Sequence, residues 1–223
     1  MTIFSPSLMC IDVLHLADEI KALEDAGVDR LHLDVMDGSF VSNFALGLSD
    51  VKSICRATKL KTEVHMMIKN PQRYVKLFAD AGADIIYFHP NAGYNPTEAV
   101  ERIKDAGAEP GIVLSPGMSV ESAMELLYIV DYVVVMGVNP GQAGQMYLPY
   151  VDHKIEKLTK LKKDLSFEIM MDGACSEEMI AKWSRRGVDG FVLGTAALFG
   201  KGGKKNSLRD YKRIIERLRA RTI

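Results

Sequence analysis

A short phrase built around glycine recurs four times along the 223-residue chain, each time after a helical pattern and before a β-rich run. It is Ala-Gly-Val-Asp at 26–29, Ala-Gly-Ala-Asp at 81–84, Ala-Gly-Ala-Glu at 106–109 and Arg-Gly-Val-Asp at 186–189. A helix commonly ends with a residue in the left-handed conformation, which glycine adopts without a Cβ clash. The phrase therefore indicates a repeated joint between a helix and the strand that follows it.

The β-rich runs number eight, and helical material follows each of them. They are expected at 3–8, 30–35, 61–67, 84–89, 110–115, 131–136, 167–172 and 189–194. An open doubly wound sheet usually has fewer strands of this kind, whereas a (β/α)8 barrel has eight. We therefore predict an α/β fold, a TIM barrel that forms a single domain over residues 1–223, with an amphipathic closing helix within 207–223.

Composition excludes several classes of partner. The chain has 28 Lys+Arg and 29 Asp+Glu, a formal charge of −1, so no bulk attraction to nucleic acid or an anionic membrane is expected. Its three cysteines are far apart and form no CxxC pair, and the N-terminus has no secretion signal, which favours a cytoplasmic protein. A homo-oligomer is expected, although no sequence feature fixes the oligomeric state.

Polar side chains gather at the ends of three of the predicted strands. Residues two apart on a strand share a face, so His32, Asp34 and Met36 point one way. His65 stands at the end of the third run and Asp172 at the end of the seventh. Because barrels place function at the C-terminal ends of their strands, these side chains are expected to meet at one mouth.

Two readings of this set compete. A single strand histidine is more often a hydrogen-bonded core residue than a ligand. Burying two carboxylates together without a cation is costly, however, and no Lys or Arg is expected on the same face of these strands. The sequence therefore predicts that His32, Asp34, His65 and Asp172 hold one divalent cation: zinc, manganese, cobalt, iron or magnesium.

Anion-binding loops are expected after the last two strands, where barrels commonly bind phosphate. The loop after the eighth strand opens a short helix at Gly194 and Thr195, and Gly173 follows the seventh strand. A third loop, 139–145, contains Gly144 and could act as a lid. Met36, Met67 and Met136 are expected to form an apolar wall at the same mouth.

Together these motifs resemble the ribulose-phosphate 3-epimerase family over residues 3–200. The matching segments are Ser5-Pro-Ser7, His32-x-Asp34-x-Met-Asp-Gly38, His65-x-Met67, Met136-x-x-Asn-Pro-Gly141-x-x-Gly-Gln145 and Asp172-Gly173. The family commonly has proline where Ser42 and Leu48 stand, and Val-Asp-Gly where this chain has Met171-Asp172-Gly173.

The resemblance implies inversion of C3 in a ketose phosphate, through proton abstraction beside a carbonyl that a cation polarises, with an enediolate intermediate. Asp34 and Asp172 would be the acid/base pair, each through an oxygen not used for the cation, and Ser7 would bond a substrate oxygen. The three methionines would wall the reacting carbons. The phosphate would be bound by Gly144, Gly173, Gly194 and Thr195.

Within that family, four markers resemble the allulose-6-phosphate 3-epimerase branch: Ser7-Leu-Met-Cys10, Phe88-His-Pro90, Ala143 and Asp172-Gly-Ala-Cys175. The expected reaction is therefore D-allulose 6-phosphate to D-fructose 6-phosphate. Epimerisation of D-ribulose 5-phosphate to D-xylulose 5-phosphate is the alternative. A phosphate-binding barrel without catalytic turnover is a remote alternative, which the two intact carboxylates disfavour.

Overall fold

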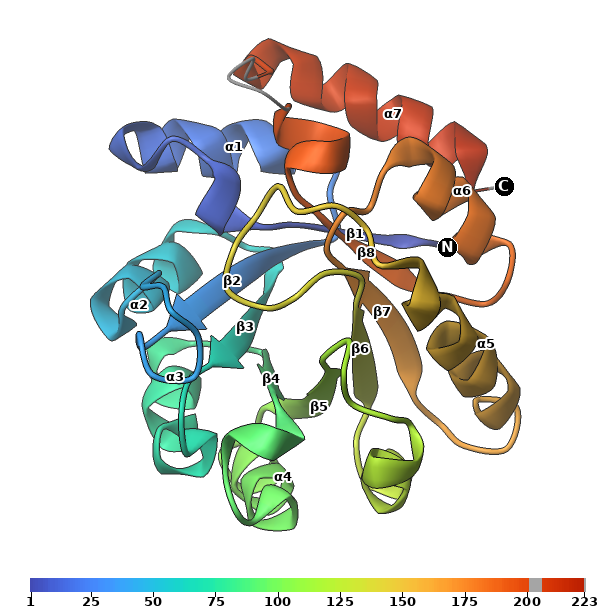
Figure 1. Cartoon of the computed structure of the whole chain (residues 1–223). Helices are drawn as coiled ribbons and strands as arrows, with labels where there is room; N and C mark the ends of the chain where they lie inside the picture. The colour runs from blue at the N-terminus through green and yellow to red at the C-terminus, as the bar shows by residue number, and fades with distance from the viewer. Residues whose placement is uncertain (201–205, 223) are drawn as a thin grey trace.

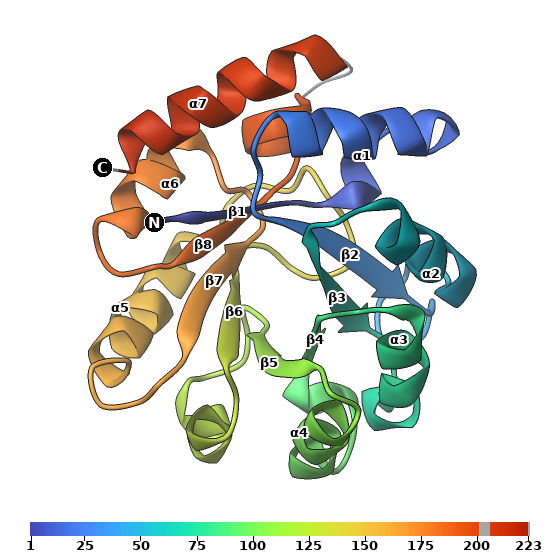
Figure 2. The same cartoon turned by 180° about the vertical axis from the view of Figure 1, so that it is seen from behind.

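Eight parallel strands form one sheet that curls into a barrel, with helices on its outside (Figures 1 and 2). The computed structural model describes residues 1–200 and 206–222. The strands are β1 Ile3–Pro6, β2 Arg30–Met36, β3 Lys61–Met67, β4 Ile85–Phe88, β5 Glu109–Leu114, β6 Tyr132–Met136, β7 Glu168–Asp172 and β8 Gly190–Leu193. Each predicted run agrees with its strand to within two residues at either end. The predicted (β/α)8 barrel is confirmed.

The barrel is nearly closed. Strand pairing follows the order β1-β8-β7-β6-β5-β4-β3-β2, and β1 and β2 meet through an isolated bridge between Ser7 and His32. The seam of the barrel therefore lies beside the residues predicted to be functional.

Helices alternate with the strands as expected. The α-helices are α1 Leu16–Asp25, α2 Leu48–Ala57, α3 Val75–Ala81, α4 Pro96–Asp105, α5 Asp152–Leu161, α6 Glu177–Ser184 and α7 Tyr211–Arg221. The 3-10 segments are Leu8–Cys10, Val13–His15, Pro71–Arg73, Pro90–Ala92, Glu121–Tyr128, Pro149–Val151 and Leu208–Asp210. The predicted closing helix is α7, which packs against α1 and α6; Ile223, at the end of its predicted range, lies outside the described residues. Among the residues described, none of the helices has both the length and the apolar character needed to cross a bilayer.

The recurring phrase forms the same joint each time. Gly27, Gly82, Gly107 and Gly187 all have positive φ, between 77° and 110°. The residue after each glycine donates its N–H to a carbonyl five residues back, which closes the helix end. In three joints the aspartate that follows accepts a backbone N–H of a neighbouring strand at 2.7 Å; these are Asp29, Asp84 and Asp189. One local phrase thus ends a helix and fixes the start of the adjoining strand.

Side chains alternate between two apolar layers. On β2, Leu31, Leu33 and Val35 point outward into the core between sheet and helices. The inner layer is smaller and is filled from the second half of the barrel, for example by Val134 and Met170. The inward face of β2 is polar, so the first strands of the barrel carry the chemistry.

The expectation that no basic side chain shares this inward face is wrong. Arg30 stands two residues before His32 on β2 and is buried; its guanidinium nitrogens lie 3.6 Å from Glu63 Oε2 and 3.2 Å from Glu168 Oε2. A count of two along the strand reaches Arg30 as readily as Asp34. Arg30 lies at the opposite end of the interior, however, and among the described residues it forms ion pairs with Glu63 and Glu168 rather than with Asp34 or Asp172.

Candidate active site

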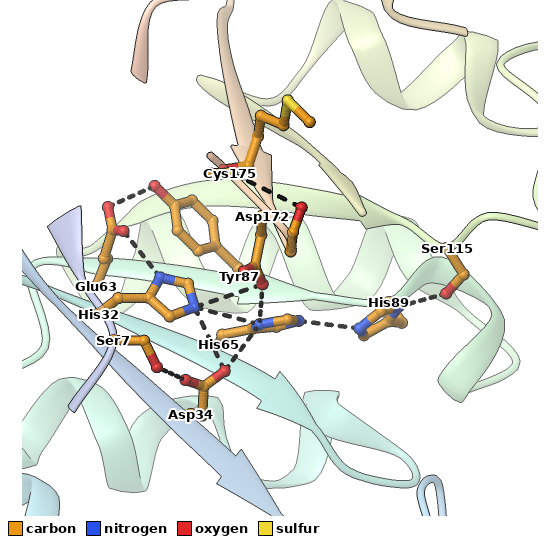
Figure 3. A network of polar contacts seen from close by, with 12 residues as sticks. Ser7, His32, Asp34, Glu63, His65, Tyr87, His89, Ser115, Asp172 and Cys175 are labelled. Atoms are coloured by element: carbon orange, nitrogen blue, oxygen red, sulfur yellow. Dashed lines mark hydrogen bonds and ion pairs between the residues drawn. The ribbon is translucent and has the colours of Figure 1, made fainter. Parts of the chain in front are cut away.

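Four side chains predicted as metal ligands converge at the C-terminal end of the strands (Figure 3). The ligand atoms of His32, Asp34, His65 and Asp172 lie within 4.8 Å of one another. His32 Nε2 is 3.3 Å from His65 Nδ1 and 3.5 Å from Asp34 Oδ1. Asp172 Oδ2 is 3.5 Å from His65 Nδ1 and 3.9 Å from His32 Nε2, and His65 Nδ1 is 3.4 Å from Asp34 Oδ1.

These separations can be compared with what a cation requires. Ligand atoms at about 2.1 Å from a tetrahedral cation lie about 3.4 Å from one another. The five separations above span 3.3 to 3.9 Å. Two imidazole nitrogens and two carboxylate oxygens at this spacing fit one borderline divalent cation.

Electrostatics hold the set together. Burial opposes the charged form of His32, but the Asp34 and Glu63 carboxylates raise the pKa of its imidazole well above the usual value. Burial likewise opposes ionisation of Asp34, but the two imidazoles hold the pKa of its carboxyl well below its usual range. The pKa of His65 is raised against burial by Asp172 and Asp34. The imidazoles and carboxylates therefore attract one another strongly across the site.

Ser7 is bound to the same cluster from the other side of the barrel seam. Its Oγ donates a hydrogen bond of 2.6 Å to Asp34 Oδ2. Asp34 Oδ2, the oxygen expected not to bind the cation, thus already accepts a hydrogen bond from the Ser7 hydroxyl. Because a hydroxyl that donates one bond still has lone pairs, Ser7 keeps the capacity to accept a bond from a substrate hydroxyl.

One cavity opens onto this cluster. Both aspartates line it, and His32 and His65 lie fully buried behind them. All the residues predicted to contact substrate also line it: Ser7, Met36, Met67, Met136, Gly144, Gly173, Gly194 and Thr195. The three methionines are at most 5% exposed, so the wall beside the aspartates is apolar and dry.

The loops after β6, β7 and β8 converge on the far side of the cavity. A Cβ on Gly144 would lie 4.0 Å from Thr195 Oγ1, and one on Gly173 would approach Val138 to 2.5 Å. Only glycine therefore fits at position 173 without movement of its neighbour. The loop after β6, yellow in Figure 1, crosses over the mouth of the barrel. The predicted short helix after β8 is a π-helical turn, Thr195–Phe199.

Two buried residues beside the candidate ligands are not among the predicted site residues. Glu63 Oε1 lies 2.8 Å from His32 Nδ1, and His89 Nε2 lies 2.9 Å from His65 Nε2. The alternation that selected His65 on β3 also selects Glu63, two residues earlier. His89 follows β4 directly, the position that marked the other site residues.

Comparison with known proteins gives the family. Residues 3–199 match the Ribulose-phosphate 3 epimerase family. This chain belongs to that family. The chain is 37% identical to ribulose-phosphate 3-epimerase of Mycobacterium tuberculosis strain H37Rv, over 87% of this chain and 85% of that protein. Identity to the enzyme of the same name is 35% for Aquifex aeolicus, over 96% of this chain and 97% of that one. For Bacillus subtilis it is 34%, over 93% and 97%. Family membership confirms the prediction of an enzyme, an isomerase of the carbohydrate-phosphate epimerase class.

Solved structures resemble the fold. 3-Hexulose-6-phosphate synthase from Salmonella typhimurium superposes with a TM-score of 0.71 at 14% identity, over 99% of this chain and 100% of that one. KGPDC from Streptococcus mutans superposes with a TM-score of 0.71 at 15% identity, over 99% and 98%. At these identities the likeness concerns the barrel alone.

Proposed function

We propose that this chain is a metal-dependent ketose-phosphate 3-epimerase that inverts C3 by two-aspartate acid/base catalysis. The observation that carries the proposal is the position of Asp34 and Asp172. They stand on β2 and β7, line one cavity, and lie against the same pair of imidazoles. Carboxylates from different strands can reach opposite faces of a flat intermediate, which is what inversion requires.

His32, Asp34, His65 and Asp172 would hold one divalent cation. When bound, it supplies a Lewis acid that polarises the carbonyl next to C3 and stabilises the negative charge that develops there. Zinc, manganese, cobalt, iron and magnesium remain candidates, because a set of two histidines and two aspartates does not select among them.

The two aspartates would divide the proton transfers between them. One carboxylate takes the C3 proton from one face, and the other carboxyl group returns a proton to the opposite face. The Ser7 hydroxyl, bonded to Asp34 Oδ2, would orient that carboxylate and accept a substrate hydroxyl. The sulfur atoms of Met36, Met67 and Met136 would exclude water without offering a competing proton.

The substrate phosphate would lie on the side of the β6, β7 and β8 loops. Gly144 and Thr195 face each other there, and Gly173 permits close approach of backbone. Gly194 would complete the set from the start of the β8 loop. Backbone N–H groups and the Thr195 hydroxyl are suitable donors to phosphate oxygens.

A coupled assay with ketose phosphates, with and without chelator, tests the reaction and the cation together. Turnover that disappears with chelator and returns with added metal is the expected result. No turnover on any ketose phosphate in metal-replete protein would favour a binding barrel without catalysis. The His65→Ala variant should lose metal and activity together, whereas unchanged metal content would contradict the assigned ligands.

Labelling in heavy water tests the two-base assignment. Product should acquire solvent deuterium at C3, while recovered substrate stays largely unlabelled because each face has its own acid. Full retention of the original hydrogen in product would rule out this division of roles.

We propose D-allulose 6-phosphate as the preferred substrate, on the branch markers at Leu8-Met-Cys10, His89-Pro90 and Ala143. The relatives above carry the name ribulose-phosphate 3-epimerase, so D-ribulose 5-phosphate is an equally serious candidate. A pocket discriminates one extra carbon by about 10- to 200-fold, so both sugars should turn over. The ratio of the two kcat/KM values, measured at the same metal concentration, decides between the substrates. A clearly higher value for D-ribulose 5-phosphate would reassign the substrate.

Other predictions from the sequence stay predictions. These are a cytoplasmic location, a homo-oligomeric state, a single domain over 1–223 and the absence of nucleic-acid and membrane partners.

A further inference from the structure

The two imidazoles of the candidate metal site enter it through different ring nitrogens. His32 presents Nε2 to the cluster and His65 presents Nδ1. A neutral imidazole carries one proton, and a nitrogen that ligates a cation must be the unprotonated one. With a cation bound, His32 therefore carries its proton on Nδ1 and His65 carries its proton on Nε2.

We infer that Glu63 and His89 are positioning residues that fix these two opposite tautomers. The inference rests on the proposed metal-dependent function. Each of the two residues lies directly behind one ligand, at hydrogen-bond distance from the nitrogen that has to be protonated (Figure 3).

The Glu63 carboxylate requires that His32 Nδ1 carry a proton. Its Oε1 is 2.8 Å from that nitrogen, and its Oε2 accepts the Tyr87 hydroxyl at 2.9 Å. Arg30 Nη1 lies 3.6 Å from the same Oε2, and Glu63 is fully buried. A carboxylate held by a phenol and a guanidinium on one oxygen is an acceptor only, so His32 has to donate to the other oxygen.

His89 Nε2 accepts a hydrogen bond from the protonated Nε2 of His65, and both rings are neutral. Two ring nitrogens face each other at 2.9 Å, so one must donate and the other must accept. With His65 as donor, the His89 proton lies on Nδ1, 3.0 Å from Ser115 Oγ. The Ser115 carbonyl is held in turn by Lys154 Nζ at 2.6 Å, which fixes the end of this chain of hydrogen bonds against α5.

The strand register explains why these partners are available. In the ladder between β2 and β3, His32 pairs with Glu63 and Asp34 pairs with His65. In the next ladder His65 pairs with Tyr87. Strand β3 therefore supplies two side chains to the site. His65 is a candidate ligand, and Glu63, two residues earlier, is the carboxylate that positions His32 on β2.

The two partners differ in charge, which predicts unequal effects. An anion behind His32 raises the basicity of the ring, whereas a neutral imidazole behind His65 only orients its ring. Loss of such a partner typically weakens metal binding by about 10- to 100-fold. We expect Glu63→Gln to fall near the upper end of this range and His89→Phe near the lower end.

Zinc affinity, measured by competition with a chromogenic chelator, tests the inference. Glu168→Gln is the matched control for Glu63→Gln, because both remove a carboxylate paired with Arg30 but only Glu63 contacts His32. His89→Gln retains an acceptor for His65 and should restore affinity relative to His89→Phe. The exposed His153→Phe change controls for loss of a histidine.

Long-range proton–nitrogen correlation spectra of the zinc-loaded wild-type protein read the tautomers directly and need no variant to fold. The expected result is a proton on His32 Nδ1 and on His65 Nε2. The reverse tautomer on either ring, or zinc affinities of Glu63→Gln and His89→Phe within about twofold of wild type, would overturn the inference.

These outcomes separate the inference from the proposed function. Wild-type protein that binds zinc with the expected tautomers but turns over no ketose phosphate would refute the proposed reaction and leave the positioning roles standing. Wild-type protein that binds no zinc at all would refute the assigned ligands and the positioning roles with them.

Discussion

The two ends of the barrel interior contain the same kinds of acidic side chain and neutralise them differently. At the N-terminal end, the floor cluster consists of Arg30, Glu63, Tyr132 and Glu168. Arg30 lies within 3.2 to 3.6 Å of both carboxylates, so the chain supplies its own permanent cation. At the C-terminal end, the mouth cluster consists of His32, Asp34, His65 and Asp172. Within residues 1–200 and 206–222, the ion pairs of Asp34 and Asp172 involve imidazoles and no Lys or Arg.

The difference teaches how to separate a structural charge cluster from a site. Buried carboxylates require compensation at either end. Where a guanidinium provides it, as for Glu63 Oε2, the charge is compensated by the chain itself, and the other oxygen of Glu63 remains for His32. Where only imidazoles face the carboxylates, the nitrogens and oxygens remain available as ligands. The mouth cluster also opens onto a cavity.

The largest effect is expected from substitutions that remove a negative charge from the mouth cluster. Asp34→Asn and Asp172→Asn should each lower kcat by roughly 10³-fold or more, because members of a cooperating catalytic set fail together. Steady-state kinetics on metal-replete protein measures the effect, with circular dichroism as the control for folding. Residual turnover within tenfold of wild type would remove that aspartate from the acid/base pair.

Removing Arg30 from the floor cluster should mainly lower the stability of the fold. Arg30→Met leaves Glu63 buried without its cation, and loss of one partner of a buried ion pair costs about 3–5 kcal/mol. Denaturant unfolding measures this loss. Lys61→Met is the control, since its ion pair with Glu109 is about half exposed and should contribute at most about 1 kcal/mol. Equal losses in the two variants would contradict the assignment of the floor cluster as structural.

Added zinc should stabilise the folded protein by binding at the mouth cluster. At a zinc concentration of 100 times the dissociation constant, mass action predicts about 2.7 kcal/mol of stabilisation. Asp172→Asn should lose most of this increment, whereas Glu168→Gln at the floor should keep it. Unfolding curves with zinc and with chelator provide the measurement. An increment that survives in Asp172→Asn would point to a cation bound elsewhere.

The smallest expected effect concerns backbone strain at the mouth. Ala174 has φ of 52°, and among the described residues Asn70 is the other non-glycine residue with positive φ. Glycine should relieve this strain, worth about 1–2 kcal/mol, but adds freedom to the unfolded chain. We expect Ala174→Gly to raise the unfolding free energy by about 0.5 kcal/mol. Ala81→Gly, at the end of α3, should lower it by up to about 1 kcal/mol and serves as the control.

The sequence by itself determined the barrel and the candidate ligand set. Periodicity marked the strands, the glycine phrase marked the joints, and a count of two along β2 and β3 placed His32, Asp34 and His65 on one face. These are local properties: alternation on a strand and the conformation of one glycine do not depend on distant residues. The same count reaches Arg30 and Glu63, so the local rule also places these two side chains on the inward face.

Only the tertiary structure decided which of these side chains act on one another. Ser7 bonds to Asp34, Glu63 to His32 and His89 to His65 because neighbouring strands pair in one register and the barrel closes at a particular seam. A shift of one residue in that register would turn every such side chain to the other face of the sheet. Register is fixed by packing across the whole barrel, and therefore no single segment of the sequence contains it.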